Sequence, residues 1–123
     1  MIVYLVTLVL SMPLWAQFFA MPVAHTAQYV ETLPGAYAMT LETGEVKLAS
    51  QCTRRGEEIL KQCLVHEGLH RAGHGECVAY LAQYIFALET KQSPESIHFA
   101  RTLYYVYGEP ACILNDTEGW DIH

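Results

Sequence analysis

Charged residues are absent from the first 30 positions of this 123-residue chain, where no lysine, arginine, aspartate or glutamate occurs. A run of this kind is rarely a soluble surface. A secretory signal would use residues 2–10 as its apolar stretch, Pro13 as a breaker and Ala16 as a cleavage point, although the usual basic residues are missing. An uncleaved membrane anchor needs about 20 apolar residues, and the run is long enough. A buried element of the fold is the third interpretation.

From these features we expect residues 1–27 to be a signal peptide or a membrane anchor, and residues 28–123 to form the folded domain. Residues 1–24 would then supply any membrane association. The protein is expected to be exported, either periplasmic or secreted, or to be membrane-anchored.

Positive charge is scarce along the whole chain. Seven lysines and arginines face 13 aspartates and glutamates, which gives a formal net charge of −6. Binding to nucleic acid depends on a basic surface, and the basic residues here are scattered. We therefore expect no nucleic-acid partner.

Closely spaced cysteine pairs are also missing, so a zinc ribbon or a redox dithiol is not indicated. The chain has four cysteines, all after the apolar run: Cys52, Cys63, Cys77 and Cys112. Four cysteines allow three pairings. In an oxidising compartment two disulfides would stabilise a small domain, whereas in a reducing one the cysteines would act as small buried hydrophobes.

The remaining pattern predicts a hairpin followed by helices. Apolar and polar residues alternate on both sides of Thr43-Gly44, which predicts strands over residues 36–42 and 45–49. Apolar residues then recur at spacings of three and four over residues 53–72, which predicts a helix capped by Thr53.

Two further helices follow the glycines Gly73 and Gly75. One is predicted over residues 76–90, and the next opens at Ser93-Pro94 and stops at Gly108. The expected fold class is α+β and helix-dominated, a short β-hairpin followed by three helices.

The first of these helices carries the fragment HEGLHRAGHGE. His66 and His70 are four residues apart, so their rings project from one helix face about 6 Å apart along the axis and can grip one ion. Glu67 lies between them, where a general base can take a proton from a water activated by the metal. This is the HExxH pattern of zinc peptidases.

A third ligand is needed to complete a zinc site. His74 would lie about 12 Å along a straight helix from His66, too far to share an ion. A turn at Gly73 can instead bring Glu76 back to the metal. The fragment then fits HExxHxxGxxE, the metzincin spacing with glutamate as third ligand, or a gluzincin glutamate with a short connection. We predict Zn²⁺ bound by His66, His70 and Glu76, with Glu67 as catalytic base.

Simpler interpretations stand beside this one. His66 and His70 can be partly exposed helix histidines, and Glu76 can be an acid favoured by the helix dipole. His74 can be an exposed turn residue, an alternative third ligand or a hydrogen-bond donor to the transition state. The residues that could stabilise an oxyanion, none of them favoured by the sequence, are Tyr80, His98, Tyr104, Tyr105 and Tyr107.

The stretch CLVHEGLH followed by GECVAYLAQYI resembles the small, zincin-like metallopeptidases. In these a hairpin precedes the HExxH helix, and the next helix brings a glutamate in an ExxAYxxQ context. Glu76, Ala79, Tyr80 and Gln83 match that context, over about residues 36–90. The resemblance implies a minimal zincin-like domain, the zinc ligands and base named above, and hydrolysis of a peptide or protein substrate.

Two other functions are compatible with the sequence. One is a non-catalytic binding module, zinc-stabilised or metal-free, exported or tethered to a membrane. The other is a membrane-associated helical protein in which the motif arose by chance, since the chain has six histidines. Metal content separates the last from the others.

Overall fold

The computed structural model describes residues 2–114, so the last nine residues of the predicted domain lie outside the described part. The fold is a helix-dominated α+β arrangement, as the sequence predicts. Its elements are α1 (Ile2–Leu10), α2 (Leu14–Thr26), β1 (Ala27–Tyr29), β2 (Ala38–Thr40), β3 (Val46–Leu48), α3 (Ser50–Thr53), α4 (Glu57–Arg71), α5 (Glu76–Glu89), α6 (Pro94–Leu103), the π-helical turn η1 (Tyr104–Gly108) and α7 (Glu109–Leu114).

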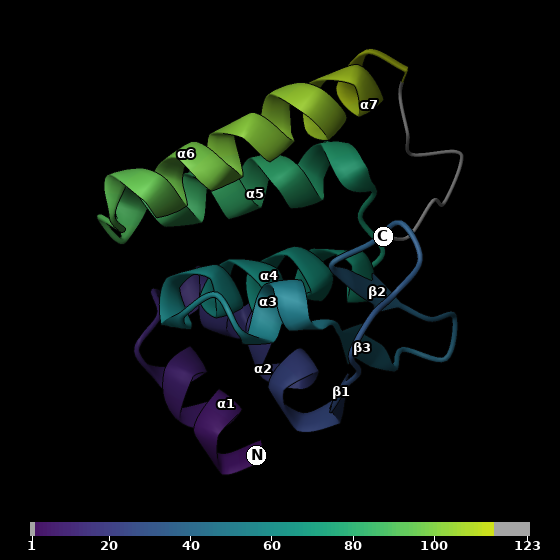
Figure 1. Cartoon of the computed structure of the whole chain (residues 1–123), viewed down its shortest axis with the longest axis vertical. Coiled ribbons are helices and arrows are strands. Elements are labelled where there is room, and N and C mark those ends of the chain that lie inside the picture. The colour runs from purple at the N-terminus through teal and green to yellow at the C-terminus, as the bar shows by residue number, and fades with distance from the viewer. Residues whose placement is uncertain (1, 115–123) are drawn as a thin grey trace.

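Helix α4 is the centre of the structure. Figure 1 shows α5, α6 and α7 as a layer on one side of α4, with α1, α2 and the sheet on the other side. Eleven of the 15 residues of α4 are buried, which leaves little of this helix exposed to water. The motif histidines therefore lie inside the protein, between α4 and α5.

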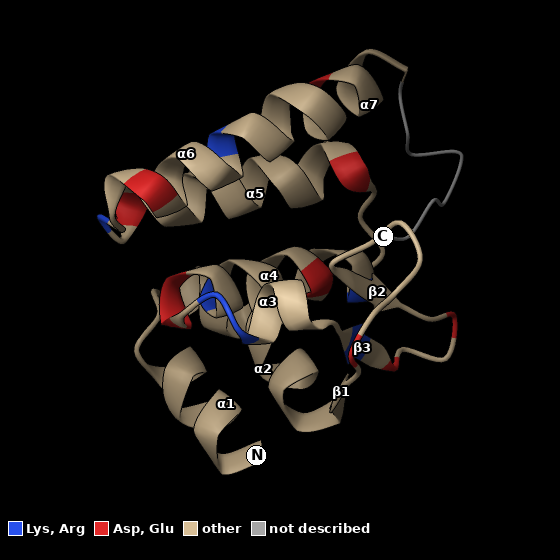
Figure 2. Ribbon diagram, viewed as in Figure 1, with Lys and Arg blue, Asp and Glu red and all other residues tan. Residues whose placement is uncertain are grey.

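The uncharged N-terminal segment forms α1 and α2, which carry no red or blue in Figure 2. Several of its side chains are fully buried in the core, among them Leu5, Val9, Ala16, Ala20 and Val23. Among residues 2–114, no helix has the length and apolarity to cross a bilayer, so the expected anchor lacks support. The third interpretation, a buried element of the fold, agrees with the packing of this segment. Its cleavage as a signal peptide stays a prediction.

Gly68 explains how closely α2 approaches the motif helix. A Cβ atom at this position would lie 2.2 Å from the backbone oxygen of Phe19 in α2. No side chain larger than hydrogen fits there without moving the α2 backbone. The glycine inside the HExxH motif, which weakens helices in general, is thus required by the crossing of α2 over α4.

The predicted hairpin is confirmed, with shorter strands. β2 pairs antiparallel with β3, placing Ala38 opposite Leu48 and Thr40 opposite Val46. The turn uses Gly44 at φ +89°. β1, which the sequence did not predict, pairs parallel with β3 and gives the order β1-β3-β2. β2 is therefore an edge strand.

Two predicted helix ends are wrong. Thr53 does not cap α4, because it is the last residue of the short helix α3. Helix α4 begins after Gly56, whose φ of +98° changes the direction of the chain. Gly108 does not stop the last helix, since the chain continues through η1 into α7. A Cβ at Gly108 would lie 2.8 Å from atoms of Tyr80 and Tyr104, so this glycine permits close packing of η1 against α5.

The predicted end of the motif helix is confirmed. Gly73, at φ +98°, donates its N–H to the His70 carbonyl at 2.9 Å, and His74 donates to the Leu69 carbonyl at 2.9 Å. These two bonds form a Schellman motif, which satisfies the last carbonyls of the helix and reverses the chain. As a result, α5 begins with Glu76 only a few residues after α4 ends.

Two disulfides select one of the three pairings. Cys52–Cys63 joins α3 to α4, and Cys77–Cys112 joins α5 to α7. Disulfides persist in oxidising compartments, so they agree with an extracellular or periplasmic environment.

Candidate metal centre

The two motif histidines face the same point. Their Nε2 atoms lie 3.1 Å apart, and the ring centroids are 4.8 Å apart. Both residues are at most 5% exposed. The expectation of partly exposed helix histidines is therefore not met, because α5 covers this face of α4.

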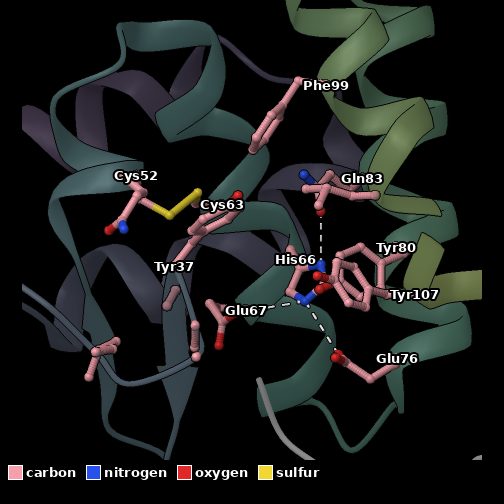
Figure 3. Close-up of a pocket in the computed structure, with 16 residues that line it drawn as sticks. Tyr37, Cys52, Cys63, His66, Glu67, Glu76, Tyr80, Gln83, Phe99 and Tyr107 are labelled. Carbon is pink, nitrogen blue, oxygen red and sulfur yellow. Dashed lines mark hydrogen bonds and ion pairs between the residues drawn. A yellow bond between two sulfur atoms is a disulfide. The ribbon is translucent and has the colours of Figure 1, made fainter. Parts of the chain in front are cut away.

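Glu76 comes to the same point from α5. Its Oε1 lies 3.5 Å from His66 Nε2 and is in direct contact with His70 Nε2. Figure 3 shows the Glu76 carboxylate directed toward His66. The glycine turn after α4 thus brings this carboxylate back to the two imidazoles.

Glu67 lies beside this cluster and is almost fully buried. The Thr40 hydroxyl on β2 donates to Glu67 Oε1 at 2.7 Å, and Glu67 Oε2 lies 3.8 Å from His66 Nε2. Metal-binding atoms of His66, Glu67 and His70 all lie within 4.8 Å of one another. These residues could hold a metal ion.

A chain of buried amides fixes the orientation of His66. Gln62 Nε2 donates to the Ser96 carbonyl at 2.9 Å, which leaves Gln62 Oε1 as an acceptor. Gln83 Nε2 donates to that oxygen at 2.9 Å, so Gln83 Oε1 faces His66 Nδ1, also at 2.9 Å. Because a backbone carbonyl can only accept, the whole chain has one polarity, and His66 must carry a proton on Nδ1.

His70 is held in the same way by a backbone group. Its Nδ1 lies 2.9 Å from the carbonyl oxygen of His74, so Nδ1 carries the proton. In their neutral forms both imidazoles therefore present the Nε2 lone pair to the Glu76 carboxylate. Three electron-pair donors meet at one buried point.

Burial and charge act in opposite directions at this point. Burial lowers the pKa of His70, but the hydrogen bond to Glu76 and the negative charges of Glu67 and Glu76 outweigh it and raise the pKa to about 9. Burial would raise the pKa of Glu76, yet the two histidines lower it. At Glu67, burial is the stronger effect and raises the pKa. In the metal-free protein a proton on His70 thus stabilises the cluster.

A cavity of about 390 Å³ opens onto His66, Glu67 and Glu76. Tyr80 and Tyr107 line it, and the Tyr80 ring packs against His66 with 4.3 Å between centroids. Burial, followed by the charges of Glu76 and Glu67, raises the pKa of Tyr80, so its hydroxyl stays protonated. Of the five predicted oxyanion candidates, these two line the cavity; His98, Tyr104 and Tyr105 do not.

The side chains of two other polar residues near the motif lie elsewhere. His74 is exposed, as expected of a turn residue, and its ring contacts the edge of Phe19. Arg71 Nε donates to the Gly44 carbonyl at 3.1 Å, so it holds the hairpin turn against the end of α4.

Thr40 and Gln62 were not predicted as site residues, and Gln83 entered only through the family context. The sequence did contain an indication of a role for the two glutamines, because each is a polar residue on the apolar face of a helix expected to be buried. No local pattern could connect Thr40 to Glu67, since they are 27 residues apart.

Comparison with protein-family models, with curated proteins and with solved structures finds no match to this chain. Any statement about activity therefore depends on the geometry described above.

Proposed function

We propose that the protein is a zinc-dependent peptidase, with His66, His70 and Glu76 as metal ligands and Glu67 as general base. The observation that carries this proposal is the meeting of two Nε2 lone pairs and one carboxylate oxygen at a buried point. Electron-pair donors repel one another unless a cation, either a proton or a metal ion, lies between them.

Two of the three separations among these atoms suit zinc, whereas Glu76 Oε1, in direct contact with His70 Nε2, would have to move away from that nitrogen to admit the ion. A tetrahedral ion with bonds of about 2.0–2.1 Å sets its ligand atoms about 3.3–3.4 Å apart. The observed separations are 3.1 Å between the two imidazole nitrogens and 3.5 Å from His66 Nε2 to Glu76 Oε1. Glu76 Oε1 is buried and, within residues 2–114, has no hydrogen-bond donor apart from the imidazole nitrogens that face it.

The outer contacts also suit a metal site. Histidine ligands usually donate their second ring N–H to a carbonyl or carboxylate, which sets the tautomer and makes the ligand more basic. His66 has this contact from the Gln83 amide oxygen, and His70 has it from the His74 carbonyl. A chance pair of histidines would not be expected to have both.

A zinc ion held there would polarise the carbonyl of a peptide bond and acidify a water. The residues of the chain supply the remaining functions. Glu67 Oε2 faces the cluster while Thr40 holds Oε1, so one oxygen is positioned to take a proton. Its raised pKa allows it to keep that proton and pass it to the leaving amine. Tyr80 keeps a neutral hydroxyl able to donate to a developing oxyanion.

The edge strand offers a place for the substrate backbone. β2 is an edge of the sheet, and Ala36, Tyr37 and Ala38 line the cavity. An extended peptide can add to such an edge through main-chain hydrogen bonds.

The test is Glu67→Gln, which keeps the size and the Thr40 contact but removes the base. We expect zinc to stay bound and peptide hydrolysis to fall by about 10²–10⁴-fold. The matched control is Glu57→Gln, an exposed residue of the same helix, which should leave hydrolysis unchanged. Hydrolysis at the wild-type rate in Glu67→Gln would eliminate Glu67 as the base.

A non-catalytic, zinc-stabilised module is the second candidate. It is favoured by the position of the ligands on two helices, because a metal there would join α4 to α5 whether or not it reacts. This candidate predicts that removing zinc lowers stability and that no peptide is hydrolysed. The Glu67→Gln protein would then behave like the wild type in every assay.

A further inference from the structure

The cavity has a polar end and an apolar end. Glu67, Glu76 and His66 form the polar end, and Figure 3 shows Phe99 and the Cys52–Cys63 disulfide on the side away from Glu76. Leu33 and Leu103 also line the cavity. Among the described lining residues, Glu67 and Glu76 are the only members of the Asp, Glu, Lys and Arg group.

The apolar end, which we call the apolar arm, is formed by Tyr37, Phe99 and the Cys52–Cys63 disulfide. Its walls are held in place by their neighbours. The rings of Tyr37 and Phe99 stack with 5.8 Å between centroids, and the Arg55 guanidinium lies 4.7 Å from the Phe99 centroid. The disulfide ties the wall on α3 to α4, one helical turn before His66.

We propose that the apolar arm receives an apolar side chain of aromatic size from a peptide substrate, at a residue next to the bond that is cleaved. The inference rests on the proposed peptidase function and adds the substrate class. The whole cavity measures about 390 Å³, within the range of about 300–1,000 Å³ common for ligand sites, so it holds one large side chain beside the cluster. An acidic side chain would have to leave water for an arm with apolar walls, which disfavours it.

The expected preference follows from burial of the side chain. Full burial of a phenylalanine side chain raises affinity about 10- to 100-fold over that of a peptide whose side chain at this position gains no free energy from burial. We therefore expect peptides with phenylalanine at this position to exceed those with aspartate by at least this factor in kcat/KM.

The experiment uses two peptides that differ only in one residue, phenylalanine or aspartate. Cleavage by the zinc-loaded full chain gives kcat/KM, and binding to the zinc-loaded Glu67→Gln protein gives affinity without turnover. Phe99→Ala removes one wall of the apolar arm and should reduce the preference for phenylalanine about tenfold or more. Leu81→Ala, at a partly exposed α5 residue outside the cavity, is the matched control and should leave the preference unchanged.

The outcomes separate this inference from the proposed function. A phenylalanine preference in binding, lost in Phe99→Ala, supports the apolar arm even if neither peptide is cleaved, in which case the peptidase proposal fails. Equal binding and equal cleavage of the two peptides would overturn the apolar arm while the peptidase proposal stands. Absence of both cleavage and preferential binding would overturn both.

Discussion

Gln83 gives the sharpest test of how the site is built. Its amide oxygen accepts from His66 Nδ1 at 2.9 Å, and its amide nitrogen donates to Gln62 Oε1 at 2.9 Å. Gln83→Leu removes both contacts in a position that is 3% exposed. The His66 ring would then lose the acceptor that fixes its tautomer, and Gln62 would lose its donor.

Two magnitudes follow from these contacts. Two buried polar groups without partners cost about 1–3 kcal/mol each, so the free energy of unfolding should fall by about 2–6 kcal/mol. Loss of a partner behind a metal-binding histidine lowers metal affinity by about 10- to 100-fold.

A second substitution separates the two effects. Gln83→Glu keeps an acceptor for His66 Nδ1 but places a carboxylate oxygen against Gln62 Oε1. Gln62 cannot reverse its amide without facing the Ser96 carbonyl with an oxygen. We therefore expect Gln83→Glu to lose stability and to retain zinc affinity near that of the wild type.

The assay is a zinc titration against a chelator of known affinity, with thermal unfolding measured on the same samples. Gln17→Leu is the control, because Gln17 makes hydrogen bonds to backbone carbonyls far from the site. If folded Gln83→Leu protein bound zinc as tightly as the wild type, the role of Gln83 in orienting His66 would be refuted.

Four further predictions concern pH, packing and the Cys52–Cys63 disulfide. Zinc binding needs a neutral His70, and the pKa of His70 is raised to about 9 in the metal-free protein. Zinc affinity should therefore rise with pH up to about pH 9, and zinc binding should release protons. A zinc affinity that stays constant between pH 6.5 and 9 would contradict this. The metal-free protein should lose stability as the pH rises over the same range. The stabilisation by protonated His70 is complete below pH 6.5 and is lost as the pH rises through about 9. Gly68→Ala should lower the free energy of unfolding by about 1–3 kcal/mol, because its Cβ would meet the Phe19 backbone, and an unchanged Tm would argue against the observed α2–α4 contact. Replacing Cys52 and Cys63 together by serine should lower the free energy of unfolding by about 2–4 kcal/mol, as measured by denaturant titration, and no change would mean that the bond does not form.

Local signals in the sequence predicted part of the fold. The hairpin around Gly44 and the break at Gly73 follow from turn chemistry that a few residues determine. Ser93 was predicted as a helix cap, and its hydroxyl accepts from the Ser96 N–H in the structure. These features depend on neighbours in sequence, so a single chain is enough to predict them.

The sequence was least informative where packing between distant residues determines the structure. Residues 2–26 have the composition of a leader or anchor, yet many of their side chains are buried in the core, and Phe19 lies against Gly68. Cleavage of this segment as a signal peptide stays a prediction. Gly108 resembles a helix stop, but Tyr80 on α5 requires a glycine there for close packing. Contacts between residues so far apart in sequence leave no local pattern.

The residues of the candidate metal centre were easier to predict than the residues that hold them in place. Spacing placed His66 and His70 on one helix face, and the structure brings the Glu76 carboxylate to both rings. The amide chain through Gln62 could not be predicted, because its polarity depends on the Ser96 carbonyl 34 residues away.

The most direct measurement is the zinc content and coordination of the purified full chain, by elemental analysis and X-ray absorption. We predict one zinc per chain, with two imidazole nitrogens and a carboxylate oxygen as protein ligands, and loss of that zinc in a protein carrying His66→Ala and His70→Ala. A purified wild-type protein that binds no zinc, or that binds it equally well without the two histidines, would contradict the account.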